Sequence, residues 1–430
     1  MSYVSKYKEL FNTINAHSIN KKLLSSLNKM VNKKTISYNV KVSELPRTYH
    51  SHEAYKIGGE TIISSSLDQG GCGACWAFAS SSMFTSRIRI NLMKTLPQDQ
   101  LKNNPFFKKI DRNTGDIGLE DVNSQQGVVN KEKGSFYKVE TLDRISPYYT
   151  AGFCPKLDAN CTSTNINECI DKTCEIKCCN INVGDLKDHF SNCIGCEGNA
   201  IIMPLIMFKE QGSALLSDFG LKAWACTFGM KQFCTPEMIK ENIEMYKAEG
   251  LLHVDSTSTL PEGVKNMEEW MMLEIYENGP IVASFDVREG FMVFGNDKNN
   301  MGQVFTADDN TGDILGGHAI MIMGWDVDDN KNSPTFGTKY WHIHNTWGPT
   351  WRGNGAFRMQ KGINLANIES DWGCVYVNGQ PKVEGFEYSN ENQLEKSQCV
   401  FSKYKVFILI AVSIFAIFII MYFLMNSKLY

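Results

Sequence analysis

The sequence predicts an α+β protein that ends in a membrane-spanning helix, and three observations carry this prediction. A helical pattern, CWAFASSSMFTSRIRINL, begins at Cys75. Strand-like apolar runs begin at His318 and lead up to Asn345. Residues 406–425 are twenty residues without a charge, a proline or a glycine. We therefore expect a helical half, a sheet half and one transmembrane segment.

Length and composition indicate a folded chain. The 430 residues are 43% apolar and 21% charged, with a net charge of −4. These values exclude a long disordered tract, and they offer no basic excess for binding nucleic acid. The length suits two or three domains, or one large domain with insertions. The fourteen cysteines are unevenly spread, and eight of them lie between Cys154 and Cys196.

Changes in composition divide the chain into parts. Residues 1–43 are polar, rich in Lys and Asn, and expected to be helical, which makes them a candidate short pro-segment. Within them, 18–31 has an amphipathic helical pattern, and no apolar run suits a signal peptide. Residues 44–382 form the folded domain, interrupted at about 92–180 by a weakly periodic stretch that we interpret as an insertion. Residues 383–404 are a polar stalk.

The apolar run at 406–425 predicts an anchor in a lipid bilayer. As a helix it would span about 30 Å, the thickness of the hydrocarbon core. A buried core helix is the alternative, although such helices are usually shorter and amphipathic. Lys403 and Lys405 precede the run and Lys428 alone follows it. The positive-inside rule therefore places the long N-terminal part in the cytosol, as in a single-pass, tail-anchored protein.

The segment 69–78, QGGCGACWAF, has the features of a nucleophilic site. Its glycines allow a tight turn in which backbone N–H groups point at a ligand. Cys75 then opens a helix, and the positive end of the helix dipole favours a thiolate over a thiol. A thiolate needs a nearby histidine to hold it as an ion pair and to protonate a leaving amine.

His318 and Asn345 are the candidate partners of Cys75. His318 opens the apolar run of GGHAIMIMGW, where a rigid backbone can fix an imidazole. Asn345 ends a strand and is followed by Trp347. An Asn carboxamide can accept from one imidazole nitrogen and leave the other facing the sulfur, while an indole shields that bond from water. This set implies no cofactor and no metal.

Segments 69–78, 316–325 and 340–357 resemble the signature segments of papain-like cysteine peptidases, in the family's order and at about its separations. The likeness is greatest to the cathepsin B branch, and it covers about 45–90 and 185–380. Further segments that resemble this branch are Leu45-Pro46, Ser86-Arg87-Ile88, Asn278-Gly279-Pro280, 311–325 and Ile368-Glu369-Ser370-Asp371. The resemblance implies a two-lobed fold, with the Cys75 helix in one half and an antiparallel sheet with His318 and Asn345 in the other.

The resemblance also implies a role for each site residue. Cys75 matches the nucleophile, His318 the general acid and base, and Asn345 the residue that orients the imidazole. Gln69 and the Cys75 N–H match the oxyanion hole. Contacts with substrate are implied for Gly198, Trp347 and Asp371. The implied activity is that of a thiol endopeptidase acting on proteins or peptides through an acyl-enzyme. An inactive peptidase scaffold in a membrane or virion is the alternative, which the intact catalytic residues argue against.

Asp371 matches an acidic residue at the base of the pocket for the side chain two residues before the scissile bond. A carboxylate there can pair with an arginine. Asp is one methylene shorter than the family's Glu, so that pair should be weaker. A solvated residue at a strand end is the alternative. The paired histidines on which dipeptide trimming depends are missing from 226–234, so that activity is not expected.

The other cysteines leave alternatives open. The resemblance pairs Cys72 with Cys196, and a redox pair of Cys72 with Cys75 is the alternative. Asn199 stands where the family has a second glycine, which puts a substrate backbone contact in doubt. The cluster from Cys154 to Cys179 could form disulfides, bind zinc or hold free thiols. Disulfides made in the cytosol would suit a large DNA virus, which we expect as the source.

The remaining histidines have ordinary interpretations. We expect His50, His52 and His253 on the surface of the protein. His344 is expected to be a strand neighbour of Asn345 and not a second base.

Overall fold

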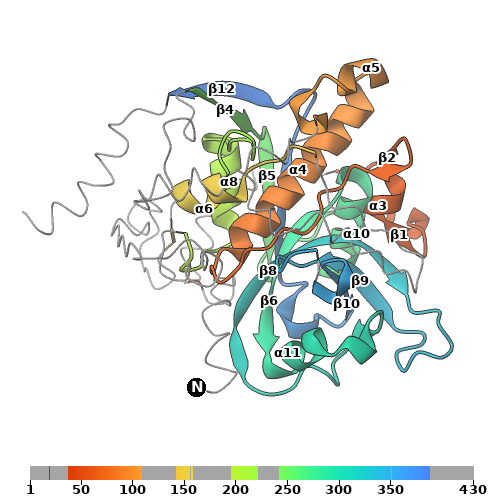
Figure 1. Cartoon of the computed structure of the whole chain (residues 1–430). Coiled ribbons are helices and arrows are strands. Elements are labelled where there is room, and N and C mark those ends of the chain that lie inside the picture. Colours follow the sequence, from red (N-terminus) through yellow and green to blue (C-terminus); the bar gives the residue numbers. More distant parts are fainter. Residues whose placement is uncertain are drawn as a thin grey trace, which may run out of the picture.

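The computed structural model describes residues 19, 37–108, 142–154, 156–157, 195–220, 242–349 and 351–387 (Figure 1). The predicted membrane anchor at 406–425 lies outside these residues, as does all of the predicted helix at 18–31 except Ile19. Among the described residues, none of the helices has both the length and the apolar character needed to cross a bilayer.

A mostly antiparallel sheet forms one half of the described structure, as predicted. Its strands, in spatial order, are β5 (Gly250–Asp255), β11 (Asp371–Tyr376), β6 (Ile281–Arg288), β8 (Ile314–Val327), β9 (Lys339–His344), β10 (Ala356–Gln360) and β7 (Val304–Phe305). β1 (Tyr49–His50) pairs with the end of β8, and only the β10–β7 pair is parallel. β8 is almost wholly buried because strands pair along its edges and helices cover the sheet, which explains its continuous apolar run.

The other half is built on the helices α4 (Cys75–Thr95), α6 (Pro147–Phe153) and α8 (Ile202–Glu210). The helices α10 (Met267–Asn278) and α11 (Glu289–Asn296) instead pack against the sheet, α10 on β6 and β8 and α11 on β6. Figure 1 shows α4 crossing the middle of the molecule, with α6 and α8 on one side and β8 on the other. Shorter helices are α3 (Ser51–Ala54), α5 (Gln98–Leu101) and the 3₁₀ turns η3 (Val42–Glu44), η4 (Pro105–Phe107), η11 (Lys298–Asn300), η12 (Trp351–Gly353) and η13 (Leu365–Asn367).

Helix α4 is buried on every side along residues 75–90. Most of its polar side chains are hydrogen-bonded inside the core, and the exceptions among the described atoms are Trp76 Nε1 and Ser80 Oγ. The fully buried Arg89 donates to the carbonyl oxygens of Ile62 at 3.1 Å, Phe106 at 3.0 Å and Asp143 at 2.7 Å. A single guanidinium thus joins α4 to segments before and after it.

These contacts show that only part of the stretch 92–180 can be an insertion. Phe106 and Ile145 are both 0% exposed, so the described residues at 92–108 and 142–157 include parts of the core. The stretch looked like an insertion because its few apolar residues show little periodicity. The segments that could still be inserted, 109–141 and 158–194, lie outside the described residues.

The start of the predicted stalk is a strand, which corrects the expectation for 383–387. β12 (Lys382–Glu387) pairs antiparallel with β4 (Asn242–Lys247) in a two-stranded sheet. Val383 is 50% exposed, so backbone hydrogen bonds hold this strand and burial contributes little at that position. Polar composition therefore gave no sign of it. A second two-stranded sheet joins β2 (Lys56–Ile57) and β3 (Glu60–Thr61).

The described end of the candidate pro-segment is bonded to α10. The Tyr38 hydroxyl donates to Glu274 Oε2 at 2.8 Å and accepts from Trp270 Nε1 at 2.7 Å. The Val40 N–H donates to Glu277 Oε1 at 2.7 Å. Asn39 Nδ2 also donates to Glu277 Oε2 at 3.3 Å, so removal of the chain up to residue 43 would break four hydrogen bonds to this helix.

Candidate active site

Cys75 is the first residue of α4, and it is 0% exposed. A tight turn leads into it, in which Gly70 adopts a φ of 60° and its N–H donates to Asp68 Oδ1 at 2.8 Å. The first turn of α4 holds no acidic residue that would offset the positive end of the helix dipole. The thiol therefore lies at the positive end of the helix dipole, as the sequence predicted, and its thiolate form stays a prediction.

Cys72 forms a disulfide with Cys196, with the two Cα atoms 4.6 Å apart. This is the pairing that the family resemblance implied, and it excludes the alternative redox pair of Cys72 with Cys75. An isolated parallel bridge between Gly73 and Glu197 lies beside it. The segment that carries Gly198 is thereby fixed next to the turn that leads to Cys75.

His318 and Asn345 form the predicted hydrogen bond. His318 Nε2 donates to Asn345 Oδ1 at 2.7 Å, and both residues are almost fully buried. His318 sits on β8 opposite Phe285 of β6, and Asn345 directly follows β9. The main-chain N–H of Asn345 donates to the carbonyl of Gly355 at 2.8 Å, which fixes the backbone that carries the Asn345 side chain. Because Nε2 is engaged, Nδ1 is the ring nitrogen suited to exchanging a proton with a thiol.

Burial controls the charge of His318. It lowers the pKa of His318 to about 4, against the opposing effect of the hydrogen bond to Asn345. An imidazolium at this position at neutral pH therefore requires a neighbouring anion. The thiolate of Cys75 is the anion that the predicted pair supplies, and the two groups would then titrate together.

Aromatic rings cover the His318–Asn345 bond. The Trp347 and His318 ring centroids are 5.1 Å apart, and Trp351 packs against Trp347 at 5.1 Å. Phe291 of α11 lies 5.9 Å from Trp347. This packing keeps water from the bond, which is the role the sequence suggested for the indole at 347.

The segment before Cys75 runs directly against the segment around Asn345. Ser66 Oγ donates to the Asn345 carbonyl at 2.5 Å. The Gln69 N–H donates to the Thr346 carbonyl at 2.9 Å, and Asp68 forms an isolated antiparallel bridge with Trp347. These contacts fix the two catalytic segments relative to each other, although they lie far apart in the chain.

Gln69 is 3% exposed and held at both ends of its amide. Nε2 donates to the Cys72 carbonyl at 2.8 Å, and Oε1 accepts from the Thr346 hydroxyl. A primary amide carries two N–H bonds, so one remains for an oxyanion. Such a pre-oriented donor is what an oxyanion hole requires, although this role stays a prediction.

Asn199 does not obstruct the segment around Gly198. Its side chain is 1% exposed and turned inward, where Oδ1 accepts from the N–H groups of Leu157 at 3.2 Å and Ala200 at 3.0 Å. Its Nδ2 donates to Cys154 Sγ at 3.9 Å. Gly198 takes a φ of 81°, whereas Asn199 has no positive φ, so the backbone conformation at 199 does not itself require a glycine.

Asp371 begins β11 and is 3% exposed, so it is not a solvated residue at a strand end. Its Oδ1 accepts from His253 Nε2 at 3.0 Å, and its Oδ2 accepts from the Ser284 hydroxyl. The strand registers place Asp371 opposite Ser284, which pairs with the neighbour of His318. Two strand spacings, roughly 10 Å, therefore separate it from the catalytic imidazole.

Several histidines lie where sequence reasoning did not expect them. His253 is 1% exposed, and His50 and His52 are half-buried beside His342 and His344. The expectation of surface positions was therefore wrong for His50, His52 and His253. The sequence held one indication of a histidine cluster: His342 and His344 are two residues apart in a strand, so their side chains lie on the same face.

The remaining cysteines of the cluster from Cys161 to Cys179 lie outside the described residues. The choice among disulfides, zinc and free thiols for them stays open. Within the described part of the chain, no three His, Cys, Asp or Glu side chains form a group that could hold a metal ion.

The family model "Papain family cysteine protease" matches residues 158–376, about half of the chain. The chain therefore belongs to the papain family of cysteine proteases. The matched residues include His318 and Asn345, whereas Cys75 precedes them and is assigned from its motif and position.

Relatives with curated names are cathepsin B-like. The chain is 40% identical over 108 residues to a "Cathepsin B-like cysteine proteinase" of Schistosoma japonicum, covering 25% of this chain and 27% of that protein. It is 27% identical over 186 residues to "Cathepsin B-like cysteine proteinase 3" of Caenorhabditis elegans, covering 41% and 46%. The chain thus spans less than half the length of these relatives. Among solved structures, procathepsin B S9 of Trypanosoma congolense aligns with a TM-score of 0.48 at 18% identity, covering 88% of this chain and 89% of that one.

Proposed function

We propose that this protein is a membrane-anchored thiol endopeptidase that hydrolyses peptide bonds through an acyl-enzyme. The observation that carries the proposal is the buried 2.7 Å hydrogen bond from His318 to Asn345, held against the segment that leads to Cys75. A thiol at a helix N-terminus with an oriented imidazole is the arrangement that nucleophilic catalysis requires. The substrates are proteins or peptides, and no cofactor enters the reaction.

The proposed reaction has two stages. The Cys75 thiolate attacks the carbonyl carbon of the scissile bond, and the oxyanion accepts hydrogen bonds from the Cys75 N–H and Gln69 Nε2. His318 then gives its Nδ1 proton to the leaving amine, which departs and leaves a thioester on Cys75. In the second stage His318 takes a proton from water, the hydroxide attacks the thioester, and the thiolate leaves as the acid is released.

A thiol-directed peptide electrophile tests the nucleophile. It should label the wild-type chain and fail to label Cys75→Ser, because the hydroxyl lacks the nucleophilicity of a thiolate. Cys374→Ser is the matched control and should be labelled like the wild type. Burial raises the pKa of Cys374 well above its usual value, which keeps that thiol protonated. Equal labelling of Cys75→Ser and the wild type would refute the proposal.

Membrane attachment is proposed from the apolar run at 406–425, with the peptidase domain in the cytosol. Deleting 406–430 should give a soluble chain that still hydrolyses peptides, because the catalytic residues all lie before residue 388. Deleting only 426–430 is the control, and that chain should stay in the membrane fraction. A chain without 406–430 that still sediments with membranes in high salt would contradict the anchor. The viral source stays a prediction.

Asp371 is proposed to read the substrate side chain two residues before the scissile bond. A substrate guanidinium would join the contacts that this buried carboxylate makes with His253 Nε2 and the Ser284 hydroxyl. We expect substrates with Arg at that position to be favoured over neutral polar ones by about 1–3 kcal/mol. In Asp371→Ala this preference should vanish, while cleavage of Phe substrates changes little. Equal losses for Arg and Phe substrates in kcat/KM would assign Asp371 to the fold alone.

A further inference from the structure

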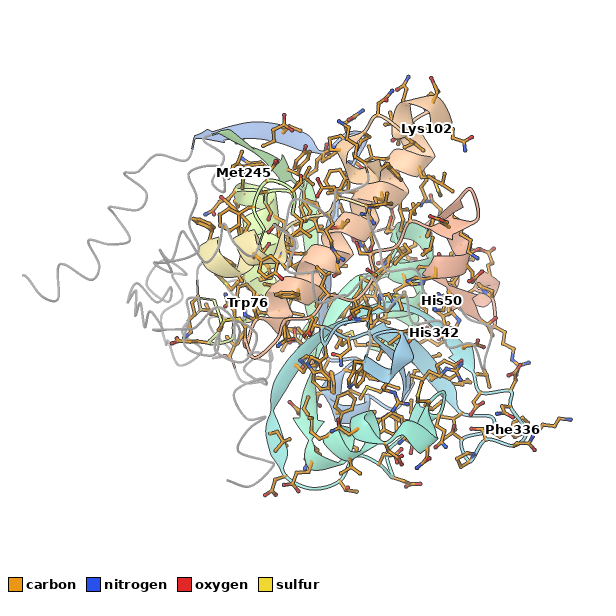
Figure 2. The ribbon with its side chains drawn as sticks, in the orientation of Figure 1. His50, Trp76, Lys102, Met245, Phe336 and His342 are labelled. Atoms are coloured by element: carbon orange, nitrogen blue, oxygen red, sulfur yellow. A yellow bond between two sulfur atoms is a disulfide. The ribbon has the colours of Figure 1, made fainter. Side chains whose placement is uncertain are left out.

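Four of the eight histidines gather at one place beside the catalytic centre. The ring centroids of His50 and His342 are 4.2 Å apart, those of His52 and His344 are 4.8 Å apart, and His50 lies 5.1 Å from His52. Figure 2 shows His50 and His342 lying together between the N-terminal strand and the sheet. We refer to these four residues as the histidine cluster. They line a cavity of about 450 Å³.

The chain topology explains why the rings meet. β1 with His50 and β9 with His342 both pair with β8 at Gly324. Gly324 has no side chain to separate the rings, and a Cβ there would approach the Tyr49 carbonyl oxygen to 2.1 Å. The cluster therefore forms the contact between the segment 49–52 and β9.

The contacts of His50 and His52 favour neutral imidazoles, whereas the His344 contact is compatible with either protonation state. His50 Nδ1 accepts from the His52 N–H at 3.1 Å, so a proton on that nitrogen would break the bond. His344 Nδ1 donates to the Ser64 carbonyl at 3.1 Å. His52 Nε2 is buried and has no hydrogen-bond partner among the described residues, so a proton there would be unsatisfied.

The surrounding charges also oppose protonation. Cations facing the cluster are Lys56, Arg144, Arg352 and Arg358, and the carboxylates near it are Glu53 and Asp326. Asp326 acts against this trend, because its Oδ2 lies 3.8 Å from His342 Nε2 and its charge also favours protonation of His50. Burial lowers the pKa of all four histidines, that of His344 to about 4. No three of these side chains form a group that could hold a metal, so proton binding is the chemistry that the cluster supports.

His344 links the cluster to the catalytic centre. The carbonyl of Ser64 accepts from His344, and the N–H of Ser64 donates to Ser86 Oγ of α4 at 3.1 Å. Two residues further on, Ser66 donates to the Asn345 carbonyl. Ser64 therefore bridges β9, which ends just before Asn345, and the helix that begins with Cys75.

We propose that His344 is a positioning residue for Cys75 and Asn345, and that the histidine cluster makes this positioning acid-sensitive. Protonation of the cluster would separate the segment 49–66 from β9 and release the two catalytic segments from each other. This inference rests on the proposed peptidase function for its effect on activity. Its structural part is independent of that function.

The direction of the pH effect follows from linkage. In an opened state each imidazole regains its usual pKa near 6.5, so below that pH the opened state binds more protons than the closed one. The ratio of closed to open molecules then falls by up to about tenfold per pH unit for each histidine. The closed state is therefore favoured at neutral pH. It is lost as the pH falls from about 6.5 towards the lowered pKa values that the histidines have in the closed state.

The structural test uses the full chain with Cys75→Ala, which removes catalysis and self-cleavage. Its urea midpoint should fall steeply between pH 7 and pH 5, and the fall should be clearly smaller in Cys75→Ala/His52→Gln. Cys75→Ala/His17→Gln, altered at a histidine outside the described residues, is the matched control and should follow the parent. Identical pH dependence in the parent and in the His52→Gln and His50→Gln versions would overturn the proposal, whether or not the wild type is a peptidase.

The activity test separates positioning from general stability. His344→Gln keeps an N–H donor for Ser64 but cannot titrate, so kcat at pH 7.5 should stay within about threefold while the acid limit of activity moves to lower pH. His344→Leu removes the donor and should lower kcat about tenfold, the effect of losing one hydrogen bond, with KM little changed. An unchanged acid limit in His344→Gln, or equal kcat in the two variants, would overturn the positioning role. If no variant hydrolyses peptides, the proposed function fails, and the urea experiment still decides the acid sensitivity.

Discussion

Replacing Cys75 by serine or His318 by alanine should lower peptide hydrolysis by about 10³-fold or more with the fold intact. The serine hydroxyl is not ionised at neutral pH, and without His318 no group holds the thiolate or protonates the leaving amine. The nucleophile and the base act as a unit, so the double variant should lose little more than either single one. Steady-state kcat/KM with a peptide substrate measures the loss, and far-UV circular dichroism with the urea midpoint checks the fold.

Asn345→Ala is the informative comparison. Asn345 holds His318 through a hydrogen bond to Oδ1, so its removal should leave a mobile but chemically intact imidazole and a smaller loss than His318→Ala. Near-normal turnover in His318→Ala would contradict the catalytic assignment. A loss in Asn345→Ala as large as in His318→Ala would mean that the amide does more than orient the ring.

The catalytic set could be predicted from sequence because each member is marked by its own local segment. The glycine-rich turn before Cys75, the apolar strand that holds His318 and the indoles after Asn345 are each readable within about ten residues. Their order and spacing then carried the family resemblance. The structure needed only to bring these segments together, and it does so through backbone contacts between 66–69 and 345–348.

The partners of Asp371 and the histidine cluster could not be predicted in the same way. Periodicity shows which face of a strand a residue occupies, but not which distant residue it meets. His253 and Asp371 are 118 residues apart, and their contact depends on the order of strands in the sheet. β12 was missed for a related reason, because its strand character lies in backbone pairing with β4 and not in an apolar face.

Replacing Arg87 by leucine should destabilise the fold by about 3–5 kcal/mol, the largest stability loss we expect from a single change. Arg87 Nη1 lies 2.9 Å from Glu274 Oε1, and the two side chains are 3% and 0% exposed. The guanidinium also donates to the carbonyls of Pro280 at 2.7 Å, Gly279 at 3.0 Å and Val375 at 3.2 Å. Removing it leaves a buried carboxylate without a counter-charge and takes this donor from three buried carbonyls. Urea unfolding at pH 7 measures the loss.

The pair itself should contribute much less than the single variant suggests, because desolvation offsets most of its attraction. Glu274 is held by the hydroxyls of Tyr38 at 2.8 Å and Tyr376 at 3.0 Å as well as by Arg87. We therefore expect the double variant Arg87→Met/Glu274→Met to be more stable than Arg87→Leu, since no charge remains buried alone.

Tyr38→Phe is the matched control for the N-terminal contact and should cost about 1–3 kcal/mol by removing one hydrogen bond to the carboxylate. If the double variant had a lower free energy of unfolding than Arg87→Leu, lost packing and not the unpaired charge would explain the destabilisation. If Arg87→Leu kept the wild-type urea midpoint, the ion pair between α4 and α10 would have no measurable role in holding the two helices together.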